Sequence, residues 1–371
     1  MPLYFDHHAA TPLDARVLEA MSRANASALG NPASPHAAGR RARALLEEAR
    51  ARVARAENAT PAEVVLTSGG TEACNLGVLG LAPPSARVLT TAIEHPAVAE
   101  PIASLALRGA QVELLALRGG ALPDDALVTA ALGRCGLLAT QAVNHESGTI
   151  LPVDRWCELA QARGVASFID ATQALGKIAI DFDTLRASAL ALASHKIGGP
   201  AGAGALVVRR GVVLAPQLLG GAQERGLRAG TPDVAALVGF GVACELLSER
   251  LAAQERIGRL RDRIEAWLIA RGARLNGDAA PRVATVTDVS IARWRSSALV
   301  AALDVEGLEV AAGAACSSGV ERPSPVVLSM FPEDPSRASS AIRISLGLET
   351  SDDDVARALA ILERVLARAP A

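Results

Sequence analysis

Short, nearly continuous apolar segments recur from about residue 60 to about residue 250, and amphipathic helical patterns separate most of them. Such segments are typical of strands that are buried on both faces of a mostly parallel sheet. The expected strands are 64–67, 87–91, 111–117, 137–143, 165–170, 187–193 and 203–208, and the expected helices are 71–80, 96–108, 124–132 and 152–163. This alternation predicts an α/β fold built on an open, doubly wound sheet.

The segments on either side of this region predict a second, smaller α+β domain. Ser34 and Pro35 are expected to open a helix that runs to about Ala56, and a long amphipathic helix is expected over 243–271. Strands at 283–291 and 342–346 and helices at 296–303 and 351–368 follow. Because 371 residues exceed the usual size of a single core, we expect a large domain of residues 14–250 and a small domain of residues 1–13 and 251–371.

Composition excludes several classes of function. The net charge is -2, aromatic residues make up 2% of the chain, and no block of basic residues occurs, which argues against nucleic acid as a partner. No apolar run approaches the roughly 20 residues of a membrane span. The N-terminus lacks the pattern of a signal peptide, so a cytoplasmic protein is expected. The five cysteines and six histidines show no metal-ligand spacing, and no metal site is expected.

Polar residues follow the ends of several expected strands. Asp170 ends one strand, Lys196 follows another, and the glycine turn 68–72 enters a helix, while His95 and Asn144 also come just after strands. Ligands of open α/β sheets bind at the carboxyl ends of the strands, so these residues can meet in one crevice. A lysine amine, a carboxylate and a helix N-terminus suit the aldehyde, ring nitrogen and phosphate of pyridoxal 5′-phosphate (PLP). Each signal alone is weak, since a strand-end lysine can be a surface residue and an aspartate a helix cap.

Cys316 differs from the other cysteines. Cys74, Cys157 and Cys244 lie among alanine, leucine and valine in helical stretches, where a buried hydrophobic role is expected. Cys316 lies in a run of small residues, 310–319, that contains two glycines and offers little to bury a thiol. A reactive thiol on a loop is the interpretation that this composition favours.

Eight ordered motifs resemble those of cysteine desulfurases of the NifS/IscS type, within the class V aminotransferases of PLP fold type I. The resemblance runs over nearly the whole length. The motifs are the segments 30–36, 67–72, 93–98, 170–173, 195–196, 223–231, 315–318 and 342–347. The resemblance implies a mostly parallel doubly wound sheet in a large domain and a smaller α+β C-terminal domain that carries a mobile cysteine loop.

The resemblance also implies how the cofactor is bound. Lys196 would bind PLP covalently, Asp170 would pair with the ring nitrogen, Gln173 would bond the ring hydroxyl and His95 would stack on the ring. The phosphate would be held by Gly70, Thr71, His195 and Ser194. Thr231 would reach the cofactor of the other subunit, which implies a homodimer.

The implied reaction converts L-cysteine to L-alanine. Arg343 would bind the substrate carboxylate, beside Asn144 and His145, and Lys196 would take the α-proton. Cys316, as a thiolate, would attack the substrate sulfur and carry it as a persulfide to a sulfur-acceptor protein for iron–sulfur cluster assembly or thiolation. Either His95 or the substrate itself would accept the proton of Cys316.

Some positions depart from the family pattern, and two alternatives stay open. His145 stands where the family usually has asparagine, Ala193 where it has a phosphate-binding serine, with Ser194 next to it, and Ala201 where it has lysine. One alternative is a selenocysteine lyase or another class V aminotransferase, which would not need Cys316. The other is a weakly catalytic PLP-binding dimer that serves as an accessory or scaffold protein.

Overall fold

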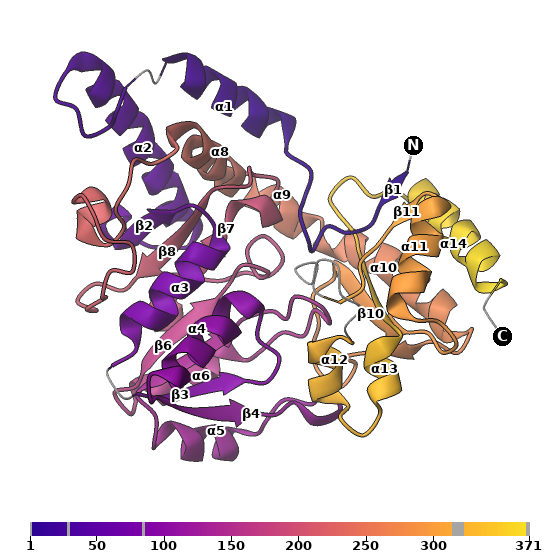
Figure 1. Ribbon diagram of the computed structural model, residues 1–371. Coiled ribbons are helices and arrows are strands. Elements are labelled where there is room, and N and C mark those ends of the chain that lie inside the picture. The colour runs from indigo at the N-terminus through magenta and orange to yellow at the C-terminus, as the bar shows by residue number, and fades with distance from the viewer. Residues whose placement is uncertain (1, 28–29, 84–85, 314–322, 369–371) are drawn as a thin grey trace.

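A seven-stranded sheet forms the centre of the computed structural model, which describes residues 2–27, 30–83, 86–313 and 323–368 (Figure 1). The strands are β2 (Val64–Thr67), β3 (Arg87–Thr91), β4 (Gln111–Leu115), β5 (Leu137–Gln141), β6 (Ala166–Asp170), β7 (Ala189–Ala193) and β8 (Gly204–Val208). Their order is β2-β8-β7-β6-β5-β3-β4. Only the pairings of β8 with β2 and β7 are antiparallel within this sheet. The predicted α/β fold with a mostly parallel sheet is confirmed.

Helices cover both faces of this sheet, because successive strand residues enter different cores. Val65, Phe168 and Leu206 pack with α3 (Gly70–Leu81) and α4 (Pro96–Leu107) on one face. Leu66, Ile169 and their counterparts in other strands pack on the opposite face. The helices of the sheet region also include α5 (Asp125–Leu132), α6 (Val153–Gln161) and α7 (Phe182–Leu185), the last of which was not predicted.

Close contact between α3 and the sheet requires a glycine. A Cβ atom on Gly77 would lie 2.3 Å from the ring of Phe168, which is fully buried in β6. Any side chain at this position would push the helix away from the strands. The N-terminus of α3 is thereby held at the carboxyl end of the sheet.

Two predicted helices differ from the observed ones. The first is α2 (Ala37–Ala56), whose cap is His36 and not Ser34, because the His36 ring accepts a hydrogen bond from the Gly39 N–H. The second is the long helix expected over 243–271, which consists of the end of α8 (Val234–Glu245), α9 (Leu247–Ala252) and α10 (Gln254–Ile269). At the first break the Leu246 N–H bonds the carbonyls of Ala243 and Cys244, so the helical hydrogen-bond ladder is interrupted. A continuous amphipathic pattern does not reveal such breaks.

The C-terminal region has its own sheet and core (Figure 1). The sheet has the order β12-β10-β9, with β9 (Arg274–Leu275), β10 (Val286–Ser290) and β12 (Ala341–Ser345), all antiparallel. β1 (Leu3–Tyr4) pairs with β11 (Leu308–Glu309), so the N-terminus joins this region. The later part of the chain also contains α11 (Ser296–Val305), α12 (Pro325–Met330), α13 (Pro335–Ser339) and α14 (Asp352–Leu366). The first helix, α1 (Ala15–Ser27), packs instead with α2 and α8. The domain boundaries at 13/14 and 250/251 stay a prediction.

No helix in the described part of the chain combines the length and apolar character needed to cross a membrane.

Glu57, at the C-terminal end of α2, yields a prediction about pH and stability. It is 2% exposed, and one of its carboxyl oxygens has no hydrogen-bond partner among the described residues. Burial, and then the charge of Asp181, raises its pKa to about 8. Between about pH 4.5 and 8 the folded state therefore holds a proton that the unfolded chain has released, and stability falls as the pH rises.

Glu57→Gln removes this titration. Relative to the original protein, we expect the variant to gain about 1.4 kcal/mol of unfolding free energy for each pH unit within that window. Urea unfolding of both proteins at several pH values between 5 and 8 measures the difference. Glu100→Gln, at an exposed site in α4, is the control and should follow the original protein. A stability difference for Glu57→Gln that does not change with pH would contradict the prediction.

Candidate active site

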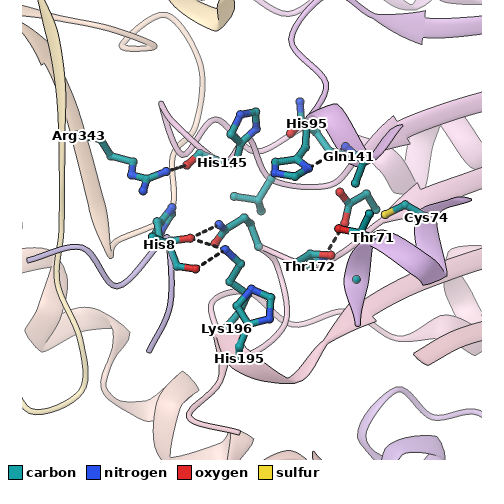
Figure 2. Close-up of a pocket in the computed structure, with 16 residues that line it drawn as sticks. His8, Thr71, Cys74, His95, Gln141, His145, Thr172, His195, Lys196 and Arg343 are labelled. Atoms are coloured by element: carbon teal, nitrogen blue, oxygen red, sulfur yellow. Dashed lines mark hydrogen bonds between the residues drawn. The ribbon is translucent and has the colours of Figure 1, made fainter. Parts of the chain in front are cut away.

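A pocket of about 170 Å³ opens at the carboxyl ends of the central strands, where the large sheet meets the C-terminal region (Figure 2). Most of the residues predicted from strand ends line it, together with residues from the N-terminal segment and β12. The lining residues are His8, Ala9, Gly70, Thr71, Cys74, His95, Ala97, Gln141, Val143, His145, Asp170, Thr172, Gln173, His195, Lys196 and Arg343.

Lys196 reaches this pocket from a short 3-10 turn, Ser194–Lys196, that follows β7. Its Nζ donates hydrogen bonds to the carbonyl oxygens of His8, at 2.6 Å, and Ala9, at 3.0 Å (Figure 2). The N-terminal segment therefore crosses the pocket and holds the lysine amine with its backbone. The sequence offered no signal for this contact, because a backbone carbonyl can be supplied by any residue type.

Asp170, the last residue of β6, and Gln173, in the turn after it, line the same pocket as the lysine. Asp170 is 6% exposed, and its carboxylate accepts a hydrogen bond of 2.9 Å from the Thr172 N–H. Gln173 donates from Nε2 to the His8 carbonyl at 2.8 Å. The thiol of Cys74 also faces Asp170, and burial together with this carboxylate raises the pKa of the thiol. Cys74 is thus a pocket residue with a protonated, unreactive thiol.

The N-terminus of α3 forms the next part of the wall. Gly70 and Thr71 belong to its first turn, whose N–H groups have no intrahelical partners and suit an anion. A Cβ atom on Gly70 would lie 3.0 Å from the Cβ of Ala193 and 3.2 Å from Thr172 Oγ1. Ala193 and Gly70 are therefore a matched pair of small residues that let the helix end approach β7.

Two imidazoles of the pocket wall, those of His95 and His195, are held in their neutral form. Burial, followed by the charge of His145, lowers the pKa of His95 to about 3, and burial, followed by Lys196, lowers the pKa of His195 to about 4. His95 also caps α4, because its Nδ1 accepts a hydrogen bond of 3.0 Å from the Ala97 N–H. The neutral ring of His95 therefore carries its proton on Nε2.

His145 lies against His95 and beside a buried carboxylate. The two rings meet edge to face with their centroids 4.9 Å apart (Figure 2). His145 Nε2 is 3.6 Å from Glu146 Oε1. Burial opposes ionisation of Glu146, but His145, the hydroxyl of Ser324 and the charge of Arg343 together lower its pKa. The imidazole of His145 thus lies beside a buried carboxylate in the pocket wall.

Arg343 enters the pocket from β12 and is 2% exposed. Its Nη1 donates to the His145 carbonyl at 2.8 Å, and its Nη2 forms an ion pair of 2.7 Å with Asp6. Figure 2 shows the guanidinium beside His8 and His145. A fixed, charged fork of donors at this place can bind a carboxylate.

The structure does not bring every predicted residue to the pocket. The side chain of Asn144 is bonded to its own turn and to a neighbouring loop: its Oδ1 accepts from the N–H groups of Glu146 and Ser147, and its Nδ2 donates to the Ile93 carbonyl. Asn144 thus holds the turn that carries His145 and does not itself line the pocket, and its substrate contact stays a prediction. The hydroxyl of Ser194 faces Gly199, where a Cβ atom would lie 2.0 Å away, and Ser194 does not line the pocket. Its phosphate contact stays a prediction.

The two remaining predicted residues are Thr231 and Cys316. Thr231 is exposed and does not line the pocket of its own chain. Cys316 lies outside the described residues. No group of histidine, cysteine, aspartate and glutamate side chains suited to a metal ion occurs within the ranges that the structure describes.

The residues that do converge fit PLP. Lys196 supplies an amine, Asp170 a carboxylate, Gln173 an amide and the first turn of α3 a set of backbone N–H groups, all lining one pocket. These groups match the aldehyde, ring nitrogen, ring hydroxyl and phosphate of the cofactor.

Comparisons with known proteins point to the same family. The model of the aminotransferase class-V family matches residues 3–358. The chain is 38% identical to the IscS-like cysteine desulfurase of Mycobacterium tuberculosis, over 99% of this chain and 96% of that protein. It is 36% identical to cysteine desulfurase IscS 1 of Archaeoglobus fulgidus, over 98% and 97% of the two chains.

Solved structures give the same result. A NifS-like protein superposes with a TM-score of 0.89 at 30% identity, over 99% of this chain and 100% of that one. SspA, solved in complex with cysteine, superposes with a TM-score of 0.80 at 29% identity, over 92% and 98%. The chain therefore belongs to the class-V aminotransferase family and, within it, to the PLP-dependent cysteine desulfurases of the IscS and NifS type.

Proposed function

We propose that this chain converts L-cysteine to L-alanine and carries the released sulfur as a persulfide on Cys316. The observation that carries the proposal is the convergence of Lys196, Asp170 and Arg343 on one pocket from three separate segments. An amine, an acid and a carboxylate-binding guanidinium are what a PLP-dependent enzyme needs for an amino acid substrate.

The residues divide into those that hold the cofactor and those that hold the substrate. PLP, when bound, supplies an aldehyde that binds an amine and a ring that accepts the electron pair left by removal of the α-proton. Lys196 binds it, Asp170 keeps the ring nitrogen protonated and Gln173 bonds the ring oxygen. Gly70 and Thr71 would hold the phosphate, with His195 nearby. Arg343 orients the substrate through its carboxylate.

Proton transfer is assigned from the geometry of the side chains. Lys196 Nζ accepts the α-proton, because it is the amine that lines the pocket. His95 would stack on the cofactor ring as a neutral imidazole, since its low pKa of about 3 opposes a second proton and its Nδ1 is used in capping α4. Of the two acceptors considered for the Cys316 proton, these contacts favour the substrate over His95.

Sulfur transfer forms one bond and breaks another. The Cys316 thiolate attacks the substrate sulfur, a sulfur–sulfur bond forms, and the bond between the substrate sulfur and its β-carbon breaks. The electron pair of the broken bond stays with the β-carbon, which takes up a proton and becomes the methyl group of alanine. The sulfur then passes to a thiol of an acceptor protein. We place the reaction in a cytoplasmic homodimer, in which the exposed Thr231 reaches the other subunit's cofactor site.

Incubation of the purified protein with L-cysteine tests the proposal. We expect alanine to be released and mass spectrometry to find one added sulfur atom on the peptide that contains Cys316. Cys316→Ala should lose both signals, with alanine release falling by about 10²-fold or more, because the nucleophile is missing. Cys135→Ser, at a half-buried cysteine away from the pocket, is the matched control and should keep both.

Two outcomes would contradict the proposal. Selenocysteine turnover that survives in Cys316→Ala would favour a selenocysteine lyase. Purified protein that binds PLP but releases no alanine would favour an accessory role for the dimer.

A further inference from the structure

Lysine is almost absent from this chain. Of its 37 lysine and arginine residues only two are lysines, Lys177 and Lys196. Arginine therefore serves as the cation nearly everywhere, and a position that keeps lysine has a need that arginine does not meet. Arginine stays charged in proteins, whereas a lysine amine can lose its proton when it is buried. Lys196 must be able to lose its proton, because its amine binds the cofactor. That role does not explain why position 177 is also a lysine.

Lys177 is connected to the active site by hydrogen bonds. Its Nζ donates to Gln173 Oε1 at 2.7 Å, and Gln173 Nε2 donates to the His8 carbonyl at 2.8 Å. The same carbonyl accepts a hydrogen bond of 2.6 Å from Lys196 Nζ. The chain's two lysines thus meet through one glutamine side chain and one backbone carbonyl.

These contacts fix which way the Gln173 amide faces. The His8 carbonyl can only accept a hydrogen bond, so the NH₂ group of the amide faces the pocket side and its oxygen faces Lys177. Without the Lys177 donor the buried amide oxygen would lose its partner. Rotation of the amide, which places oxygen where NH₂ now lies, would then be far less opposed.

The surroundings of Lys177 require an uncharged amine. Lys177 is 9% exposed and lines a second cavity, of about 30 Å³, together with His7, Lys196 and Arg250. Among the described residues that line this cavity there is no aspartate or glutamate. Burial, followed by the charges of Lys196, Arg250 and Arg343, lowers the pKa of Lys177 far below its usual value. An arginine here would be a buried cation without an anion.

We propose that Lys177 is a positioning residue that holds the Gln173 amide with its NH₂ group directed at the cofactor's ring oxygen. This inference rests on the proposed function, which assigns Gln173 to that oxygen. Lys177 itself touches neither cofactor nor substrate in this arrangement and acts through Gln173.

The first test compares folding of Lys177→Met and Lys177→Arg. Methionine is unbranched and neutral, whereas arginine is a permanent cation. Although arginine is normally the more conservative replacement for lysine, we expect Lys177→Arg to be the less stable of the two variants. We expect thermal unfolding of the apoprotein to show a midpoint about 5 °C or more lower for Lys177→Arg than for Lys177→Met. Gln254→Met, which alters another residue of the same cavity, is the control for loss of a polar group there. A Lys177→Arg variant as stable as the original protein would contradict the inference that the amine of Lys177 is uncharged.

The second test uses the absorbance of bound PLP to detect the proposed hydrogen bond from Gln173 to the ring oxygen. The pH at which the absorbance of bound PLP changes should move up by about half to one pH unit in Lys177→Met, because an amide donor that stabilises the deprotonated ring oxygen is lost. Gln173→Ala should produce a shift in the same direction. The double variant should shift no further than Gln173→Ala alone, because Lys177 acts only through Gln173.

The outcomes separate this inference from the proposed function. Additive shifts in the double variant, or an unchanged titration in Lys177→Met, would overturn the positioning role even if the original protein releases alanine from cysteine. Conversely, the spectral titration needs bound PLP but no desulfurase turnover. The positioning role can therefore stand if the sulfur chemistry proves to be different.

Discussion

Lys196→Ala is expected to abolish alanine formation from L-cysteine. The substitution removes the amine that binds the cofactor and accepts the α-proton, and a positioned acid–base group alone accounts for about 10²–10⁴-fold in rate. Alanine release measures the loss. Mass spectrometry after borohydride reduction should find no PLP attached to the variant. Added methylamine should restore part of the rate, because a small amine can enter the space left by the lysine side chain.

The Lys196→Arg variant distinguishes the chemical role of the lysine amine from its role in holding the N-terminal segment. Lys196 also ties the N-terminal segment in place through the carbonyls of His8 and Ala9. Arginine can donate to these carbonyls, yet it cannot lose its proton to act as an amine. We expect this variant to be folded and inactive, with no response to methylamine. Turnover in Lys196→Arg would show that the α-proton is taken by another group.

Arg343→Lys is expected to weaken binding of L-cysteine by about 10- to 150-fold, the effect of losing a charge-assisted hydrogen bond of about 1.5–3 kcal/mol. The guanidinium offers a planar pair of donors that an ammonium group cannot reproduce. Steady-state kinetics should show a higher KM and a smaller change in kcat. Cysteamine lacks the carboxylate, so its binding, measured as inhibition of alanine release, should be the same in the variant and the original protein.

Arg343 also has structural contacts that a control must account for. It is paired with Asp6 and bonded to the His145 carbonyl, so its replacement lowers stability as well. Arg209→Lys alters a partly buried arginine that stacks on Phe182 and does not line the pocket. We expect Arg209→Lys to lose stability but keep the KM. Equal weakening of L-cysteine and cysteamine in Arg343→Lys would contradict carboxylate recognition.

The sequence predicted the central sheet and most of the pocket. Strands buried on both faces appear as apolar runs, and residues placed directly after them, such as Asp170 and Lys196, must emerge at one edge of a parallel sheet. Gly70 and Thr71 followed from the same rule, because a glycine turn after a strand opens a helix at that edge.

Contacts made by backbone atoms escaped prediction from sequence. The carbonyls of His8 and Ala9 hold Lys196, but no side-chain pattern reports on a carbonyl. Asn144 was expected to reach the crevice because it follows a strand, yet its amide is bonded within the local turn and to the Ile93 carbonyl. His36 caps α2 in place of Ser34, because the chain path before the helix decides which side chain reaches the free N–H groups.

Periodicity and motif spacing by themselves determined the strand and helix order, the edge of the sheet that carries the site and the residue types suited to PLP. They do so because the burial of a strand on two faces and the periodicity of a helix both depend on residues that are close together in the sequence. Only the tertiary structure decided which candidates face the pocket, how His95 is protonated and that Lys177 meets Gln173. Those properties depend on distances between atoms far apart in the chain, and on the loss of water around them, which no local pattern encodes.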